Sequence, residues 1–290
     1  MPNRKLVSFL YGLPWLLTFV IFWAFPLLYS FVIGFTDYRL LQRGYSWVGW
    51  GNYVALFHDP AFLSALKNTF IFVIGTIPAT TVISLLLALM VNRRFRGRGL
   101  FRAGYFVPSI TSMVVVALVF THLFSRGGYV AMLAQMVGLT PPANGFLYDS
   151  GTALASIMAM DVWMAVGYYM LIFLAGLKSI PDELYEAAEI NGASSLRQFV
   201  SITLPLLKPV TLFIIVINSI KSFQVFTEIF VMTRGKFDTS SAVYFVYEKG
   251  LTTRYDFGYA SAAAYLLFVI IGLLSLAQFA LFRQRKKLSW

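Results

Sequence analysis

The 290-residue sequence contains no cysteine and only two histidines, His58 and His122. Without cysteine there can be no disulfide framework, no thiolate nucleophile and no thiolate-bound metal. Two histidines are too few for a histidine-based metal site, so we expect no metal. A phosphate-binding loop is missing as well, because Gly235-Lys236 is followed by Phe237. If a nucleotide powers this protein, another chain must bind it.

Charged residues are also scarce. They make up 12% of the chain, about half of their usual share, whereas apolar residues make up 59%. This leaves too few polar side chains to cover a surface that faces water. The composition therefore excludes an ordinary cytosolic enzyme, a disordered chain and a collagen. It indicates an all-α polytopic membrane protein.

Six stretches almost free of charge could each cross a bilayer, whose apolar core is about 30 Å thick and needs about 20 helical residues. The expected helices cover residues 7–35, 68–92, 103–125, 152–177, 209–233 and 257–282, within a single transmembrane domain of residues 1–290. The first stretch could instead be a cleaved signal peptide. Its apolar run is too long for that, and no small-x-small cleavage site follows it.

The basic residues predict the orientation of these helices, because basic residues collect on the cytoplasmic side. With both termini in the cytoplasm, 14 of the 23 basic residues are cytoplasmic: Arg4, Lys5, Arg93, Arg94, Arg96, Arg98, Arg102, Lys178, Arg197, Lys208, Arg283, Arg285, Lys286 and Lys287. The net charge of +11 then has a topological cause. The basic cluster at residues 93–98 is expected at anionic lipid headgroups. We expect no nucleic-acid partner.

The loop of residues 178–208 has helical features of its own. Pro181 followed by two acidic residues suits a helix start, and Asn191-Gly192 suits a helix end. A second short helix is expected to start at Ser194-Ser195 and to end at Pro205. The loop is therefore predicted to be a cytoplasmic helix-turn-helix elbow. It could be an interfacial amphipathic hairpin or a docking element for a partner protein.

A signature motif lies in this elbow. It begins at Glu186-Ala187-Ala188, continues at Gly192 and ends at residues 202–205, where Leu204 and Pro205 close it. The motif resembles the EAA loop of the permease subunits of bacterial ATP-binding-cassette importers. Further segments resemble the carbohydrate-importer branch, in particular the larger of the two maltose-transporter permeases: residues 26–38, 47–53, 58–62, 222–226 and 255–262. One departure is Arg234-Gly235-Lys236, where the family usually has a Gly-Gly-Pro turn.

The resemblance implies a complete transport machine in the bacterial inner membrane. This chain would pair with a second permease subunit, two cytoplasmic ATPase subunits and an extracytoplasmic solute-binding protein. It would be no enzyme and would bind no cofactor, because the partner subunits bind ATP and magnesium. The elbow would couple ATP-driven closure to the helices, and Glu186 is the expected polar contact. Ala187, Ala188 and Gly192 would permit close approach and a tight turn.

Substrate residues are expected where polar groups lie inside the spans, because such groups are costly in a membrane. At 100° per residue, one face of the expected fifth helix contains Asn218, Lys221, Ser222, Gln224, Val225 and Glu228. The expected fourth helix contains Asp161, Trp163 and Tyr168. The resemblance implies sugar contacts at Trp163, Met164, Ala165, Tyr168, Asn218, Lys221, Ser222 and Val225. Ala165, Lys221 and Val225 depart from the family pattern, so the substrate's identity does not follow.

Each of these residues also has a structural alternative. The aromatic residues could pack between helices, and Asn218 and Ser222 could bond neighbouring helices. Lys221 could pair with Glu228 or Asp161, which would leave the site nearly neutral and suited to a sugar or polyol. If Lys221 instead binds the substrate, an anionic solute such as a glycerol phosphate is expected. A secondary transporter or a membrane-embedded enzyme are the alternatives of another class, but the inverted repeats and carboxylate clusters that they need are not found.

Overall fold

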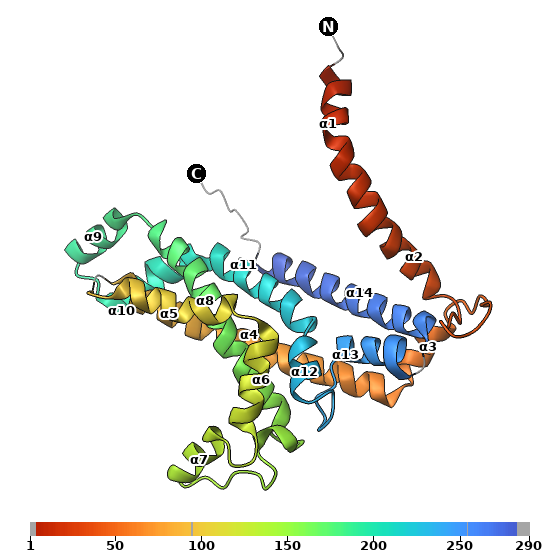
Figure 1. The fold of residues 1–290 in the computed structure, drawn as a ribbon. Coiled ribbons are helices and arrows are strands. Elements are labelled where there is room, and N and C mark those ends of the chain that lie inside the picture. The colour runs from red at the N-terminus through yellow and green to blue at the C-terminus, as the bar shows by residue number, and fades with distance from the viewer. Residues whose placement is uncertain (1–3, 94, 254, 283–290) are drawn as a thin grey trace. The chain divides into compact units, whose positions relative to one another are not determined.

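The computed structural model describes residues 4–93, 95–253 and 255–282 (Figure 1). The described residues are helical apart from turns, loops and three isolated β-bridges. Arg94 and the four basic residues expected to anchor the C-terminus, Arg283, Arg285, Lys286 and Lys287, lie outside the described residues. The chain divides into two compact units, residues 1–63 with 245–269 and residues 64–244 with 270–290.

The first unit gathers the outer-loop segments that the sequence singles out. It contains α1 (Arg4–Phe19), a π-helix (Val20–Ala24), α2 (Phe25–Ile33), α3 (Gly51–Phe57) and the beginning of α14 (Phe257–Phe282). Asn52 donates two hydrogen bonds of 2.9 and 2.8 Å to the carbonyls of Gly34 and Thr36. Arg39 pairs with Asp256 at 3.3 Å. Segments far apart in the sequence are thereby joined around the end of the first span.

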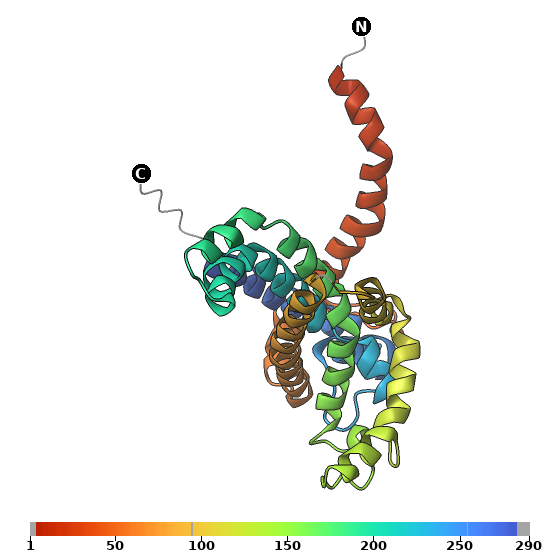
Figure 2. The same ribbon diagram turned by 90° about the vertical axis from the view of Figure 1, so that its left-hand side faces the viewer.

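The second unit contains the remaining helices. They are most of α4 (Pro60–Asn92), α5 (Arg98–Ile110), α6 (Met113–Phe124), α7 (Tyr129–Met136), a 3₁₀-helix (Phe146–Tyr148), α8 (Ala153–Lys178), α9 (Asp182–Ile190), α10 (Ser195–Gln198), a π-helix (Phe199–Thr203), α11 (Leu204–Phe223), α12 (Thr227–Met232) and the first half of α13 (Ala242–Tyr247). The second half of α13 and the π-helix that follows it (Glu248–Thr253) belong to the first unit. The elbow helices α9 and α10 lie at one end of this unit and α7 lies at the other (Figures 1 and 2).

Within the described residues, five helices are long and apolar enough to cross a membrane, or six if a bent pair forms one span. The bent pair is α5 and α6, which meet at 97°. The expected continuous helix over residues 103–125 is therefore wrong. Thr111 has an extended backbone with ψ of 151°, and the preceding turn contains Pro108, whose nitrogen donates no hydrogen bond. Together these residues end α5 and change the direction of the chain.

The fifth span also differs from its expected form. The expected helix at 209–233 is interrupted at residues 224–226, between α11 and α12. Its start differs too, because Pro205 does not end the second arm of the elbow. Pro205 lies in the first turn of α11, where a missing N–H costs little, and the helix runs on from Ser195 to Phe223 through a π-helical turn. The second arm of the elbow and the span form one continuous helix.

The core of the second unit is built around α8, which is buried along most of its length. Gly167 lies against α5 so closely that an added Cβ would overlap the backbone carbonyl of Tyr105. Because this neighbour is backbone, it cannot move aside as the end of a side chain can. The glycine therefore permits the close approach of α5 and α8.

Gly167→Ala is accordingly expected to destabilise the protein by about 1–3 kcal/mol, the usual cost of overpacking. The measurement is the thermal unfolding midpoint in detergent together with the amount of protein in the membrane. Gly272→Ala is the matched control, since Gly272 also lies in a spanning helix but a Cβ there meets no atom within 4 Å. Equal midpoints for the two variants would contradict this account of the contact.

Candidate functional site

A polar pocket lies where α11 is interrupted. Its volume is about 460 Å³. It is lined by residues from α4, α6, α8, α11, α12 and the interruption: Phe72, Met113, Asp161, Ile217, Ile220, Lys221, Ser222, Gln224, Val225, Phe226, Thr227 and Glu228. Several of the expected substrate residues are among them: Lys221, Ser222, Gln224, Val225 and Glu228. Most residues of the face expected on the fifth helix therefore do line one pocket, although the helix that carries them is interrupted.

An ion pair occupies one wall of this pocket. The Lys221 ammonium donates to Oδ1 of Asp161 at a distance of 2.9 Å. The Asp161 side chain is only 2% exposed, whereas the Lys221 side chain is 42% exposed. Oδ2 of Asp161 is buried and has no hydrogen-bond partner among the described residues. The lysine partner that the sequence left open is therefore Asp161.

Glu228 lies on the far side of the interruption, in the first turn of α12. It is only 5% exposed and lines the same pocket as Lys221 and Asp161. The sequence placed it on the same helix as Lys221, two turns away. The two residues are instead on different helices, and they share the pocket because the chain breaks between them.

A chain of hydroxyl and amide groups backs the pocket. The Ser222 hydroxyl lies 3.3 Å from the Thr76 hydroxyl of α4 and 3.5 Å from Oδ1 of Asn218. Asn218 is fully buried, and its Nδ2 has no hydrogen-bond partner among the described residues. Asn218 therefore lies behind the pocket wall and does not line the pocket.

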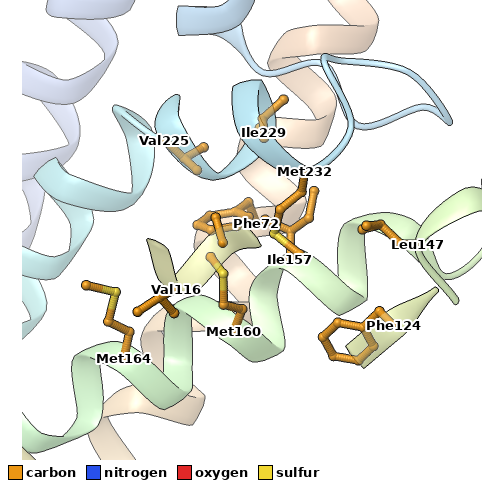
Figure 3. Close-up of a cluster of buried hydrophobic side chains, with 11 residues drawn as sticks. Phe72, Val116, Phe124, Leu147, Ile157, Met160, Met164, Val225, Ile229 and Met232 are labelled. Carbon is orange, nitrogen blue, oxygen red and sulfur yellow. The ribbon is translucent and has the colours of Figure 1, made fainter. Parts of the chain in front are cut away.

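Two further expected contacts are part of the hydrophobic core. Met164 is 7% exposed and Val225 is 3% exposed, and both belong to one buried cluster (Figure 3). The cluster joins α8, α12 and the interruption to α4 and α6 through Phe72, Val116, Phe124, Leu147, Ile157, Met160, Ile229 and Met232, with Ala117. Val225 also lines the pocket, whereas Met164 does not. Ala165, 5% exposed, is buried in a second cluster.

The aromatic candidates on α8 face elsewhere. Trp163 is 47% exposed, contacts Phe120 at a ring distance of 5.2 Å and lines a separate apolar groove of about 920 Å³. Tyr168 is 45% exposed and lies edge-on to Tyr169. Neither lines the polar pocket. The structure of this chain therefore does not assemble an aromatic platform beside the polar groups.

Sequence reasoning missed the pocket's apolar wall and the interruption itself. The apolar residues Phe72 and Met113 come from distant helices and have no polar signal. The interruption at Gln224, Val225 and Phe226 contains neither glycine nor proline. The carbonyl of Val225, freed from the helical pattern, accepts a hydrogen bond of 2.7 Å from the Ser241 hydroxyl. A partner 16 residues away supports this break, so no local pattern could indicate it.

The elbow ends its first arm in the manner that the sequence predicts. Gly192 has a φ of +73°, and its N–H donates to the carbonyl of Glu189 at 2.9 Å. The N–H of Ala193 donates to the carbonyl of Ala188, also at 2.9 Å. These two bonds form a Schellman motif, in which a left-handed residue closes the helix. Pro181 differs slightly from expectation, since it caps the helix and Asp182 begins it.

The two arms of the elbow are joined by a side-chain hydrogen bond. The Tyr185 hydroxyl of α9 lies 2.9 Å from the hydroxyl of Thr203, which is 4% exposed. Ser194 caps α10 by accepting from the amide of Arg197. The elbow is therefore tied to the base of the fifth span, a contact that the sequence did not indicate.

The signature residues lie on the outside of the elbow. Glu186, Ala187, Gly192, Leu204 and Pro205 are exposed and Ala188 is half-buried. Large apolar side chains accompany them: Ile190 is 86% exposed and Leu196 is 72% exposed. An exposed surface of this kind is typical of an interaction site.

Metal binding has no support in this part of the molecule. Among the described residues there is no group of three or more histidine, aspartate or glutamate side chains that could hold a metal ion. The described lining of the pocket has only two carboxylates, and a lysine lies beside them. The acidic residues of the elbow are spread along one exposed helix and do not converge on one point.

Comparison with known proteins assigns the chain to a family. Residues 80–288 match the model of the binding-protein-dependent transport system inner membrane component. The lactose transport system permease protein LacF of Rhizobium radiobacter is 34% identical over 92% of this chain and 90% of its own length. The arabinooligosaccharides transport system permease protein AraP of Bacillus subtilis is 32% identical over 94% of this chain and 88% of its own.

A solved structure has the same fold. The structure of a bacterial alginate ABC transporter in complex with an alginate pentasaccharide-bound periplasmic protein contains a chain that is 25% identical to this one, with a TM-score of 0.84. The match covers 98% of this chain and 96% of that chain. The protein therefore belongs to the binding-protein-dependent transport system inner membrane components and is a multi-pass permease subunit of an ABC importer, in which ATP is bound by other subunits.

Proposed function

We propose that the chain forms part of the path by which a sugar or related polyol crosses the inner membrane. The observation that carries this proposal is a polar pocket inside the membrane domain. Relatives that match most of the chain support it, because their names state lactose and arabinooligosaccharides as the transported solutes. The pocket offers hydroxyl, amide, carboxylate and ammonium groups, which are the partners that sugar hydroxyls need. Lys221, Ser222, Gln224 and Glu228 are the proposed contacts.

The pairing of Lys221 with Asp161 supports a sugar over a phosphorylated polyol. An anionic solute would be attracted by the charge of the ammonium, but that charge is already balanced by a buried carboxylate that accepts its hydrogen bond at 2.9 Å. Removing Lys221 from Asp161 to bind a phosphate would leave the carboxylate unpaired in an apolar environment, which is costly.

The proposed partners follow from the family and from the elbow. A second permease subunit would cover the open side of the pocket, and an extracytoplasmic binding protein would deliver the solute. Each of two cytoplasmic ATPase subunits would accept an elbow, one from each permease, with Glu186, Ala187 and Ala188 of this chain at the contact. In this arrangement the elbow and both termini are cytoplasmic, and the end of the unit that carries α7 is extracytoplasmic.

Chemical modification inside the pocket tests the proposed path. The sequence contains no cysteine, so Gln224→Cys introduces the single thiol of this chain. A bulky thiol reagent attached at residue 224 is expected to abolish ATP-driven uptake, because the reagent fills much of a space of about 460 Å³. Uptake is measured with the cognate binding protein and a panel of radiolabelled sugars and polyols.

Met136→Cys is the control, since Met136 is 78% exposed at the end of α7 and does not line the pocket. Modification there is expected to leave uptake unchanged. Normal uptake after full modification of residue 224 would exclude this pocket from the transport path. The same panel identifies the solute, which the relatives' names leave open.

A further inference from the structure

The pocket has an unequal number of charges of each sign. Its charged lining residues are Asp161, Lys221 and Glu228, two acids and one base. The sequence suggested that a lysine paired with one acid leaves the site nearly neutral. The structure shows the pair, but it also places the second acid in the same pocket, so the three groups together have one negative charge in excess.

The groups around these side chains do not cancel the excess. Among the described residues, Lys221 is the only cation that lines the pocket, and its ammonium donates to Asp161. The other oxygen of Asp161 is buried and has no hydrogen-bond partner among the described residues. The side chain of Glu228 forms no ion pair among the described residues. Two carboxylates therefore share one ammonium.

We propose that this pocket selects solutes by charge, taking ammonium-bearing sugars most readily, neutral sugars next and anionic sugars such as uronates or sugar phosphates least. The inference rests on the proposed function of the pocket as part of the transport path. An ammonium group would lie in the field of Glu228 and Asp161, whose two negative charges are balanced by only one lysine. A carboxylate or phosphate would meet the same groups with repulsion.

Charged thiol reagents measure this selectivity directly and do not depend on the binding protein's own specificity. The assembled importer with Gln224→Cys is treated with a methanethiosulfonate that has either a trimethylammonium or a sulfonate group. The modification rate of this chain is followed for each reagent, with and without binding protein and ATP. The ratio of cationic to anionic rates is normalised to the same ratio at Met136→Cys, where no pocket residue is near.

The expected normalised ratio is about ten or more, since one net charge within several ångströms of a partly shielded site changes local ion concentrations by this order. Adding Glu228→Gln, which keeps the shape and removes the excess charge, should bring the ratio close to one. Adding Asp161→Asn together with Lys221→Met removes one charge of each sign and should preserve the ratio. A ratio of one or below in the Gln224→Cys protein would overturn the proposal, as would a ratio that Glu228→Gln does not lower.

The same samples separate this inference from the proposed function. If modification blocks uptake but the ratio is one, the pocket belongs to the path and the charge selectivity is wrong. If the ratio is high but uptake continues after full modification, the pocket has the proposed polarity and lies outside the path. If neither reagent reacts at residue 224 in any state, the pocket is closed to solutes and both proposals fail.

Discussion

Replacing Gly192 by proline is expected to leave the protein in the membrane and to lower ATP-driven uptake by tenfold or more. Proline holds φ near −65°, whereas Gly192 has a φ of +73°, and proline lacks the N–H that bonds to Glu189. The Schellman motif therefore cannot form, and the first arm of the elbow leaves its position. The measurement is uptake per amount of membrane-inserted protein, with ATPase activity of the assembled importer measured in parallel.

Gly192→Asn separates the turn from the contact surface. Asparagine adopts left-handed backbone conformations more readily than most residues, and an added side chain at residue 192 meets open space. This variant should therefore keep most of the uptake. Glu186→Ala should lower uptake while the elbow stays folded, because it removes only the proposed polar contact. Normal uptake by a well-inserted Gly192→Pro protein would show that the elbow does not couple the ATPase to transport.

Lys221→Met is expected to destabilise the protein by about 3–5 kcal/mol, which is the usual cost of leaving a buried charge without its partner. The reason is the difference in exposure between the two side chains. The Lys221 side chain is 42% exposed and loses little, but the Asp161 side chain is 2% exposed and pairs with no other cation among the described residues. The thermal unfolding midpoint in detergent and the amount of membrane-inserted protein measure the effect.

The double variant Lys221→Met with Asp161→Asn tests this reason. Removing both charges should recover most of the lost stability, because the remaining asparagine can be buried at lower cost. A double-mutant cycle gives the coupling between the two residues. If the double variant is no more stable than Lys221→Met alone, the ion pair is not what holds Asp161 inside the unit.

Features that depend on local pattern could be predicted from the sequence. The sixth span at residues 257–282 agrees with the observed helix, because a long apolar run between charges defines it. The end of the elbow's first arm was predictable as well, since Asn191-Gly192 can form a left-handed helix end without help from distant residues. Family membership followed from the same loop, where every signature residue is close in sequence.

Features that depend on distant partners could not be predicted. The break in the fifth span needs the Ser241 hydroxyl, and the choice of Asp161 over Glu228 as partner of Lys221 depends on how α8 and α11 approach each other. The prediction that these residues share one face was made for a continuous helix. Most of the same residues do line one pocket, but they lie on two helices and in the break between them.

The continuous helix from Ser195 to Phe223 restricts how this chain can vary. Each residue of an α-helix turns the following part by about 100°, so one inserted or deleted residue would rotate Lys221 and Ser222 away from the pocket while the elbow stayed in place. Changes of length in this stretch are therefore excluded, whereas exchanges of single side chains at the pocket leave the elbow untouched. A new solute preference can thus arise by point substitution without a new ATPase contact having to arise with it.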